Sequence, residues 1–448
     1  MVNSRSLAYQ VLLHIEQKAA HTDRMIRTVL ERHSALEERD RALLTELVYG
    51  VVRWRGRLDW HIDRLSRVKP EKIAQPVRIL LRLALYQIFF LDRVPNHAAV
   101  NETVIIAKAS QPEHVIRFIN ALLREAVRRG DNWDWPAKDK DPAQYTAVTT
   151  SHPAWLVRKL AQQIGMEETV LFCEANNRVA PAVFRVNTLK ATTPRVIEAL
   201  GEVGLDALPS PLLLHALRLP SPRRDITKTG AFLEGWIQAQ DEASQLVTYV
   251  LAPKRGERIL DLCSGFGIKS THMAIFMENE GEVLSVDRSA WKLEDLRQNA
   301  ARQGVGITRT MAEDILQIDP AKIGLFDRVL LDAPCTGFGS IRRNPDIKWN
   351  RHVKDPYRMS QLQKELLAHA ALFVKSGGAL VYATCSVLTD ENEAVAKGFT
   401  QTHPEFVPES AADHIPDNCN TMTSGPYFSS WPHRHDVDGF FAARWKKD

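Results

Sequence analysis

Hydrophobic positions in the first 130 residues recur every three or four residues, as they do in amphipathic helices. The segments LAYQVLLHI, DRALLTELVYGVVRW, QPVRILLRLALYQIFFL and VNETVIIAKA follow this spacing, with almost no β-type alternation. A turn-rich, charged stretch, GDNWDWPAKDKDP at 130–142, interrupts the pattern and is typical of a linker. The pattern predicts an all-α N-terminal bundle, which we place at residues 1–135.

The pattern changes twice after this stretch. A helical piece, PAWLVRKLAQQIG, precedes the β-rich FRVNTLK, a proline-rich run and GAFLEGWIQAQDEASQLV, which together predict a small α+β module over residues 143–235. From Arg258 onward, short apolar strands alternate with helical stretches. This alternation favours a parallel, doubly wound α/β sheet, in a last domain over residues 236–448.

Length and composition are those of an ordinary globular protein. The 448 residues suffice for about three domains of roughly 150 residues each. Hydrophobic residues make up 44% and charged residues 25%, which excludes fibrous and mostly disordered classes. No apolar run approaches the ~20 residues that cross a bilayer, and the N-terminus turns polar too soon for a secretory signal. We therefore expect a cytoplasmic protein without a membrane partner.

Charge is distributed unevenly along the chain. The formal net charge is +4, but residues 1–130 hold 22 lysines and arginines against 14 acidic residues. Within this basic part, the motif RWRGRLDW interleaves Arg53, Arg55 and Arg57 with two tryptophans, a combination that can bind RNA through phosphate pairing and base stacking. The alternative is that the tryptophans belong to the core and the arginines to a solvated face. Either way, an anionic partner is expected at the N-terminal part.

Five cysteines occur, at positions 173, 263, 335, 385 and 419. None forms a C-x-x-C pair, and their odd number and wide spacing do not suit a disulfide framework. The sequence predicts free thiols and no metal site.

Acidic residues follow three successive predicted strands of the last domain. RILDLCSGFGIKS, 258–270, is a strand running into a glycine-containing turn, a place where backbone N–H groups can approach a nucleotide. Asp287 ends the next strand, 20 residues after Gly267, where an acid can bind ribose hydroxyls. Asp314 and Asp332 follow the third and fourth strands. Each acid alone could be a helix cap or loop residue, but three at successive strand ends indicate a ligand site.

Two cysteines follow adjacent strands of this sheet. Cys335 comes after FDRVLLDAP, and Cys385 comes after GGALVYAT. Adjacent strand ends point into one crevice, so the two thiols should flank one ligand. A free cysteine is often merely buried, but a thiolate is also a strong nucleophile when its pKa is lowered. A thiolate that adds to an electron-poor ring carbon activates the neighbouring carbon toward an electrophile.

These motifs together resemble one known family. The resemblance rests on DAPC at 332–335, IRRNPDIKW at 341–349, YATCS at 382–386, QDEASQLV at 240–247 and PHRHDVDGFFAARW at 432–445. In this combination the chain closely resembles the bacterial ribosomal RNA cytosine-5 methyltransferases of the RsmB (Sun or Fmu) family. Its first 130 residues look like that family's NusB-like RNA-binding domain. The resemblance covers nearly the whole chain.

The resemblance implies a covalent mechanism with S-adenosylmethionine as cofactor. It makes Cys385 the nucleophile that attacks C6 of a cytosine in small-subunit ribosomal RNA, and Cys335 the second thiol, which assists release of the adduct. It gives Asp332 a hydrogen bond to the protonated ring N3, with Lys269 assisting. The target base would be flipped out of its stack to reach the site, and the enzyme is expected to act as a monomer.

The resemblance also implies binding residues. Those for the cofactor are Cys263, Ser264, Gly265, Phe266, Gly267, Ile268, Lys269, Asp287, Asp314 and Asp332. For RNA, Arg342, Arg343 and Lys348 would hold the displaced strand together with Trp349. The alternative for these last four residues is a solvated loop with a packed tryptophan.

The cofactor loop departs from the family pattern. That loop usually reads Cys-Ala-Ala-Pro-Gly-Gly-Lys, whereas here Phe266 replaces the proline and Ile268 replaces the glycine before the lysine. Both changes add bulk where the backbone should approach the cofactor. A second hypothesis is therefore a non-catalytic RNA-binding or ribosome-assembly protein that kept the fold. Retention of both cysteines argues against it, and the basic helical part argues against a third, a methyltransferase acting on protein or small molecules.

Overall fold

The computed structural model describes residues 3–18, 22–220 and 225–448. These residues form two compact units. A helical unit runs to Arg178 and also takes in Arg343–Val353, and a sheet unit comprises Val179–Arg342 and Lys354–Asp448. The predicted domain boundaries at 135 and 236 remain predictions, since these units divide the chain elsewhere.

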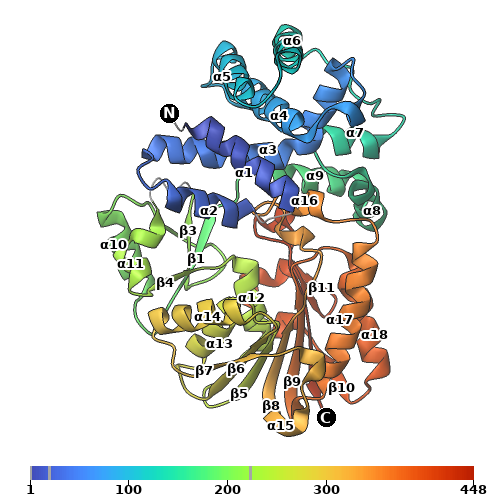
Figure 1. Cartoon of the computed structure of the whole chain (residues 1–448). Helices are drawn as coiled ribbons and strands as arrows, with labels where there is room; N and C mark the ends of the chain where they lie inside the picture. Colours follow the sequence, from blue (N-terminus) through green and yellow to red (C-terminus); the bar gives the residue numbers. More distant parts are fainter. Residues whose placement is uncertain (1–2, 19–21, 221–224) are drawn as a thin grey trace. The chain divides into compact units, whose positions relative to one another are not determined.

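The helical unit confirms the all-α prediction for the N-terminal part (Figure 1). Its elements are α1 (Ser4–Lys18), α2 (Thr22–Arg32), α3 (Glu38–Leu65), η1 (Pro70–Lys72), α4 (Gln75–Phe90), α5 (Asn96–Lys108), α6 (Glu113–Arg129), α7 (Pro142–Thr149), α8 (Ala154–Ile164), α9 (Met166–Asn177) and α16 (Ile347–Asn350).

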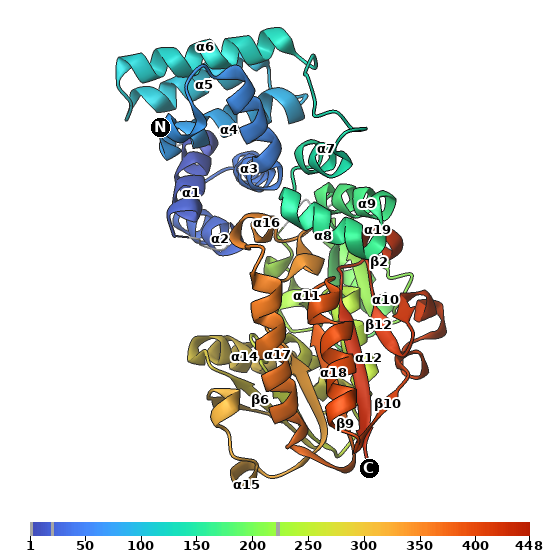
Figure 2. The same cartoon turned by 90° about the vertical axis from the view of Figure 1, so that its right-hand side faces the viewer.

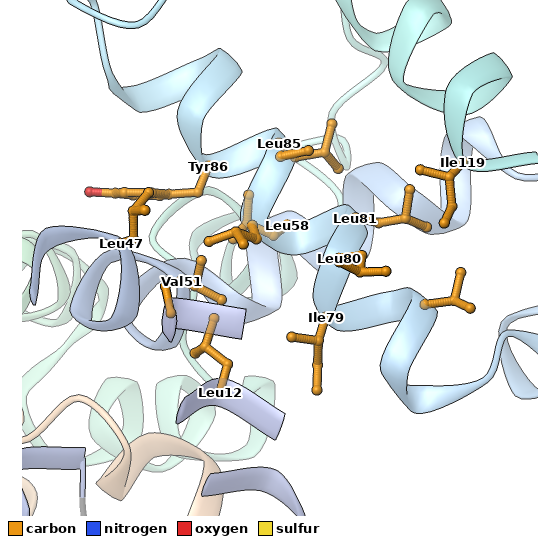
Figure 3. Close-up of a cluster of buried hydrophobic side chains, with 14 of the residues drawn as sticks. Leu12, Leu47, Val51, Leu58, Ile79, Leu80, Leu81, Leu85, Tyr86 and Ile119 are labelled. Atoms are coloured by element: carbon orange, nitrogen blue, oxygen red, sulfur yellow. The ribbon is translucent and has the colours of Figure 1, made fainter. Parts of the chain in front are cut away.

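Helix α4 is the centre of this unit's core. It begins with a proline in its first turn, and a continuous buried run follows from Ile79 to Gln87, so the helix is covered on all sides. Figure 3 shows its leucines among side chains of α1, α3 and α6. Gly50 of α3 lies under the Tyr86 ring, where a Cβ atom would come within 1.9 Å of the ring carbon Cζ. Only glycine allows α3 and α4 to approach this closely.

The stretch at 130–142 is irregular, as predicted, but it is packed against a helix. Trp135 stacks on Trp60 of α3 with ring centroids 4.6 Å apart and nearly parallel planes. Trp133 meets His61 edge-on at 4.2 Å. Aromatic contacts of this kind are favourable beyond the area they bury. Trp133 and Trp135, which lie in the predicted linker, therefore pack this stretch against α3.

The second segment of the helical unit, Arg343–Val353, is anchored by Lys348. This side chain is fully buried, and its Nζ donates to the backbone carbonyls of Arg53 and Ser151 at 2.7 and 2.8 Å. Trp349 Nε1 donates to the carbonyl of Val52 at 2.7 Å. The segment is thus tied to the middle of α3 through backbone acceptors.

The sheet unit begins with a small antiparallel sheet in the strand order β2-β3-β1-β4. Its elements are β1 (Ala182–Val186), α10 (Thr193–Glu202), β2 (Leu208–Pro209), β3 (Ala216–Leu219), η2 (Ile226–Lys228), α11 (Gly230–Leu233) and β4 (Ile237–Ala239). This agrees with the predicted α+β module.

A larger sheet follows, in the order β11-β12-β13-β9-β8-β5-β6-β7, with β10 paired to β13. Its strands are β5 (Arg258–Leu262), β6 (Glu282–Asp287), β7 (Thr308–Ala312), β8 (Phe326–Asp332), β9 (Val374–Thr384), β10 (Phe406–Glu409), β11 (Thr423–Ser424), β12 (Tyr427–Ser429) and β13 (Phe441–Lys447). The parallel part, β5 to β9, confirms the doubly wound prediction. The antiparallel strands β10 to β13 were not predicted.

Helices and short turns connect these strands. They are α12 (Glu242–Leu251), α13 (Ile268–Phe276), α14 (Ala290–Gln303), η3 (Ile315–Gln317), α15 (Pro320–Ile323), η4 (Phe338–Ser340), α17 (Asp355–Ala371), η5 (Thr389–Glu391), α18 (Glu393–Thr402), η6 (Ala411–Asp413), η7 (Asp417–Met422) and α19 (Pro432–His435).

Two apolar layers cover the faces of the large sheet. Neighbouring residues of β5 point to opposite faces: Ile259 packs with α12, α13 and α14, whereas Leu260 packs with α17 and α18. Figure 2 shows α17 and α18 side by side over their face. Burial on both faces explains why these strands read as continuous apolar runs.

The strand order reverses between β5 and β8, because β6 and β7 lie on one side and β9 on the other. In open α/β sheets, ligands bind at the carboxyl ends of the strands that flank such a reversal. The Gly-containing loop after β5 and the Asp332–Cys335 segment after β8 both lie at this edge.

Candidate functional site

The two predicted thiols lie together at the carboxyl ends of β8 and β9. These strands are paired in parallel, with Asp332 opposite Ala383. Cys335 and Cys385 follow within three residues, and their Sγ atoms are 3.4 Å apart. The cysteines are therefore neighbours, as the sequence predicted from adjacent strand ends.

The environment of the two thiols is asymmetric. A hydrogen bond with Cys385 and burial raise the pKa of Cys335 well above its usual range. Cys335 therefore keeps its proton at neutral pH. A protonated thiol at 3.4 Å can donate to the other sulfur, which would stabilise negative charge on Cys385.

Lys269 and Asp332 form an ion pair beside the thiols. The Lys269 Nζ lies 2.6 Å from Asp332 Oδ2, and the lysine also lies over the Phe440 ring. Burial alone would lower the pKa of Lys269, but the Asp332 carboxylate outweighs it and raises that pKa above its usual value. The lysine stays charged, and it holds Asp332 in place at the rim of the adjoining pocket.

The loop after β5 is built on two left-handed glycines. Gly267 has a φ of +70°, and a Cβ there would lie 2.1 Å from Leu296 Cγ. Gly265 has a φ of +56°, and its N–H donates to Asp287 Oδ2 at 3.0 Å. The second Asp287 oxygen accepts from the Ser289 N–H at 2.8 Å. The loop and the end of β6 are thus joined through one carboxylate.

A cavity of about 270 Å³ lies at these strand ends. Among the predicted residues, its lining includes Cys263, Gly265, Asp287, Asp314 and Asp332. Sequence reasoning missed the rest of the lining, which is Arg288, Lys292, Ile315, Leu316, Pro334, Leu362 and Leu366. Five of these missed residues supply an apolar wall that no motif reports, and Arg288 and Lys292 add two cations.

Some predicted loop residues do not line this pocket. Phe266 is 42% exposed and meets Trp291 edge-to-face, with ring centroids 5.4 Å apart. Ser264, Gly267 and Ile268 are likewise outside the lining. The bulk introduced at Phe266 and Ile268 is therefore not directed into the pocket.

Burial limits the chemistry of Cys263, and a backbone hydrogen bond gives Asp314 a structural role. Burial raises the pKa of Cys263 to about 12, so this thiol lines the pocket without being a nucleophile at neutral pH. Asp314 accepts a hydrogen bond from the Leu316 N–H at 3.1 Å and so caps η3. The capping alternative considered for the acids therefore holds for Asp314, which nevertheless lines the pocket.

Asp261 is an acid that sequence reasoning missed. It lies in β5, is fully buried, and accepts a hydrogen bond from Ser270 Oγ at 2.5 Å. Its Oδ1 has no hydrogen-bond partner within the described part of the chain. Burial raises the pKa of Asp261 to about 7. The signal in the sequence was a lone acid inside an otherwise apolar strand, RILDL.

The structure buries three of the predicted RNA-binding cations, Lys348, Arg53 and Arg342. Lys348 is fully buried on backbone carbonyls, and burial lowers its pKa well below the usual value. Arg53 is 9% exposed, under the segment that Lys348 anchors. Arg342 is 3% exposed, and its Nη1 donates to Asp436 Oδ1 at 2.6 Å. Helix packing and ion pairing remove these three cations from solvent, so their RNA contacts stay predictions that this packing does not favour.

The other arginines of the RWRGRLDW motif are partly exposed. Arg57 lies over the Trp135 ring at 4.8 Å, and Arg55 lies near Glu16. The two tryptophans of the motif pack inside the unit: Trp54 stacks on Phe90 and Trp60 on Trp135. Both tryptophans are partly buried in these ring contacts, and Arg55, Arg57 and Arg343 remain predicted RNA contacts.

Within the described residues, no helix is long and apolar enough to cross a membrane. No group of three or more histidine, cysteine or acidic side chains in that part of the chain is arranged to hold a metal ion.

Three protein families match consecutive parts of this chain. The NusB family matches residues 2–128, the ferredoxin-like domain of the RsmF/B-like methyltransferases matches residues 152–227, and the 16S rRNA methyltransferase RsmB/F family matches residues 248–446. The matches follow the order of the predicted helical part, α+β module and doubly wound domain.

Full-length relatives give the same assignment. The probable ribosomal RNA small subunit methyltransferase B of Bacillus subtilis (strain 168) is 34% identical over 447 residues, covering 99% of this chain and 98% of the relative. The corresponding methyltransferase B of Escherichia coli O6:K15:H31 is 35% identical over 445 residues, with 99% and 98% coverage. The crystal structure of PH0851 is similar over 100% of this chain and 99% of its own, at 29% identity and a TM-score of 0.84.

Proposed function

Because the chain belongs to the ribosomal RNA small subunit methyltransferase B family, the S-adenosylmethionine-dependent cytosine methyltransferases of 16S ribosomal RNA, we propose that it methylates C5 of its target base through a covalent adduct with Cys385. The observation that carries this proposal is the 3.4 Å approach of two thiols next to the Lys269–Asp332 pair. A protein that only binds RNA needs neither feature.

In this mechanism the Cys385 thiolate adds to C6 of the cytosine. The Asp332 carboxylate, held by Lys269, accepts a hydrogen bond from the protonated ring N3, which makes C6 more electron-poor. The electron pair of the C5–C6 double bond then becomes available at C5. Bound S-adenosylmethionine supplies the electrophilic methyl group.

Cys335 acts after methyl transfer. Loss of the proton on C5 and departure of the Cys385 thiolate restore the C5–C6 double bond. Cys335, which keeps its proton and lies 3.4 Å from the Cys385 sulfur, can donate a hydrogen bond to the departing thiolate and so assist its release. In this proposal Cys385 is thus the nucleophile, and Cys335 is the group that assists its release.

The pocket residues fit the proposed cofactor. The lining combines the carboxylates of Asp287, Asp314 and Asp332 with apolar side chains, the mixture of polar and apolar groups that suits a nucleoside cofactor. Asp287 would bind the ribose hydroxyls. Asp314, with the apolar side chains of Ile315 and Leu316, would hold the adenine.

We also infer a surface for the ribosomal RNA on helix α6. His114, Arg117, Arg124 and Arg128 are exposed at spacings of three, seven and four residues, which places them on one stripe of the helix. Arg128 is paired with Glu125, whereas Arg117 and Arg124 have no ion-pair partner within the described residues. Unpaired arginines on one helical face suit a phosphate backbone.

Two further inferences, on the oligomeric state and the cellular location, follow from the same proposal. The two thiols, Lys269 and Asp332 meet within the sheet unit, so the proposed chemistry needs no second copy of the chain, and we infer that the enzyme acts as a monomer. We infer a cytoplasmic location from its substrate, because bacterial ribosomal subunits assemble there. Light scattering of the purified protein tests the first point, and a dimer mass would contradict it.

The test is methyl transfer from labelled S-adenosylmethionine to 16S ribosomal RNA by cysteine variants. Cys385→Ala should abolish product and adduct, because no nucleophile reaches C6. Cys335→Ala should retain adduct formation and accumulate an RNA–protein complex that survives denaturing electrophoresis. Cys173→Ala is the control, since this cysteine is buried in α9 of the helical unit. Full activity of Cys385→Ala would exclude the proposed nucleophile, and turnover by Cys335→Ala without adduct would exclude the release role.

A further inference from the structure

Glu391 is a buried carboxylate directly behind the two cysteines. It ends η5, its side chain is fully shielded from solvent, and no lysine or arginine pairs with it among the described residues. Burial raises the pKa of Glu391, whereas its hydrogen bonds lower it, and burial is the larger effect. Neutral donors surround this carboxylate, and they come from the two cysteine loops and α17.

The carboxylate contacts the residue that follows each cysteine. Glu391 Oε1 accepts from the Thr336 N–H at 2.8 Å, and Oε2 accepts from Thr336 Oγ1 at 2.6 Å. Oε2 also accepts from Ser386 Oγ. One oxygen is therefore shared between the loop that carries Cys335 and the loop that carries Cys385.

Two neighbouring amides hold the residues that precede the cysteines. Gln363 of α17 donates from Nε2 to the Pro334 carbonyl at 2.9 Å and lies 3.5 Å from Glu391 Oε1. Asn392 Oδ1 accepts from Thr384 Oγ1 at 2.6 Å. Its Nδ2 donates to the Ser386 carbonyl at 2.9 Å. Both residues flanking each cysteine are thus fixed by one polar cluster.

We propose that Glu391 is a positioning residue that sets the distance between the Cys335 and Cys385 sulfurs by binding Thr336 and Ser386 together. This inference rests on the proposed two-thiol mechanism and adds a group to it that touches neither base nor cofactor. A carboxylate can accept from several donors at once, whereas an amide has one acceptor oxygen and brings two donors of its own. Glu391→Gln therefore cannot bind all three donors, and the two loops lose their common acceptor.

The first readout is the spacing of the thiols and needs no substrate. Diamide, an azo oxidant, takes up the two thiol protons and two electrons as a Cys335–Cys385 disulfide forms, and the linked peptides are counted by mass spectrometry. Close thiols should be linked rapidly in the unmodified protein. Glu391→Gln should slow this linkage at least tenfold, because a displacement of the reacting atoms by about 1 Å is enough to cost orders of magnitude.

The second readout is methyl transfer. Glu391→Gln should lower kcat for 16S ribosomal RNA by about 100-fold and leave the KM for S-adenosylmethionine within about twofold, since Glu391 does not line the pocket. Ser386→Ala removes only one donor and should give a smaller loss in both readouts. It also keeps the test decisive if Glu391→Gln does not fold.

The matched control is Glu393→Gln, two residues away. That carboxylate is also largely buried, but its Oε2 has no hydrogen-bond partner within the described part of the chain. This variant should keep the wild-type linkage rate and kcat. A lowered Tm in Glu391→Gln with unchanged linkage rate and kcat in the folded protein would overturn the proposal and leave Glu391 a stability residue.

The two proposals can fail separately. If the unmodified protein forms the disulfide but Cys335→Ala traps no RNA adduct, the covalent mechanism is wrong and the positioning of the thiols by Glu391 can still be measured. If Cys335→Ala traps the adduct while Glu391→Gln keeps both rates, only the role of Glu391 is refuted.

Discussion

At the scale of single residues, burial decides which charged groups of this protein act on a ligand and which only hold the fold. Lys269 and Lys348 are both buried, but Lys269 faces a carboxylate and stays charged. Lys348 faces neutral backbone carbonyls, and burial lowers its pKa. The same contrast separates Asp332, which a lysine stabilises, from Asp261, which has only a hydroxyl partner.

Asp261 gives a prediction about pH. Its pKa of about 7 in the folded protein lies above the 3.8 of an exposed aspartate. The folded state therefore binds more protons than the unfolded state between these values, and Asp261 lowers the free energy of unfolding as pH rises from about 4 to 7. In the cofactor-free protein, Asp261→Asn should raise that free energy at pH 8 by up to about 4 kcal/mol and change it little at pH 4.

Urea unfolding of both proteins at several pH values measures this effect. An effect of Asp261→Asn that is the same at pH 4 and pH 8 would show that the carboxyl does not titrate with a raised pKa.

At the scale of elements, the exposure of a cation depends on which face of its helix it occupies and on where that helix packs. A short sequence motif does not report either property. The RWRGRLDW motif lies in α3, whose surroundings bury Arg53 and partly bury both tryptophans of the motif against other aromatic rings. Helix α6 has a less conspicuous sequence, EHVIRFINALLREAVRR, yet it exposes its cations on one face while its apolar face enters the core. An amphipathic helix at the edge of a bundle can present charge in a way that a central helix cannot.

Neutralising the α6 stripe tests this view. The double variant Arg117→Gln/Arg124→Gln should weaken ribosomal RNA binding and reduce the slope of log affinity against log salt by about 2, one for each phosphate contact. Filter binding over a range of salt concentrations gives the slope. The control is Arg27→Gln/Arg39→Gln, which removes the same charge from exposed positions of α2 and α3. Equal slopes for both double variants would place the RNA surface elsewhere.

At the scale of the whole molecule, the two units have separate cores, and the cofactor pocket belongs to the sheet unit. A ligand that binds only the folded state stabilises it by mass action, by about 2.7 kcal/mol at 100 times its Kd. S-adenosylmethionine should therefore slow hydrogen exchange in β5, β6 and α13 and leave α4 unchanged. Hydrogen–deuterium exchange with and without the cofactor measures this, and equal protection of α4 would contradict it.

The sequence alone determined the fold class, the parallel strands and the close approach of the two free thiols. Periodicity reports which faces are buried, and parallel strands bring their carboxyl ends to one edge wherever the rest of the chain lies. The antiparallel strands β10 to β13 escaped prediction because three of them are at most four residues long and show too little alternation.

Only the tertiary structure decided which polar residues act together. Glu391, Gln363 and Asn392 meet Thr336 and Ser386 through bonds that span up to 55 positions, and no local pattern marks such partners. Burial alone distinguishes Asp261 from the other acids by raising its pKa. Burial likewise removes Lys348 from the solvent, where the sequence had placed it. Solvent exposure and the approach of distant side chains depend on how the elements pack, and packing is a property of the folded chain as a whole.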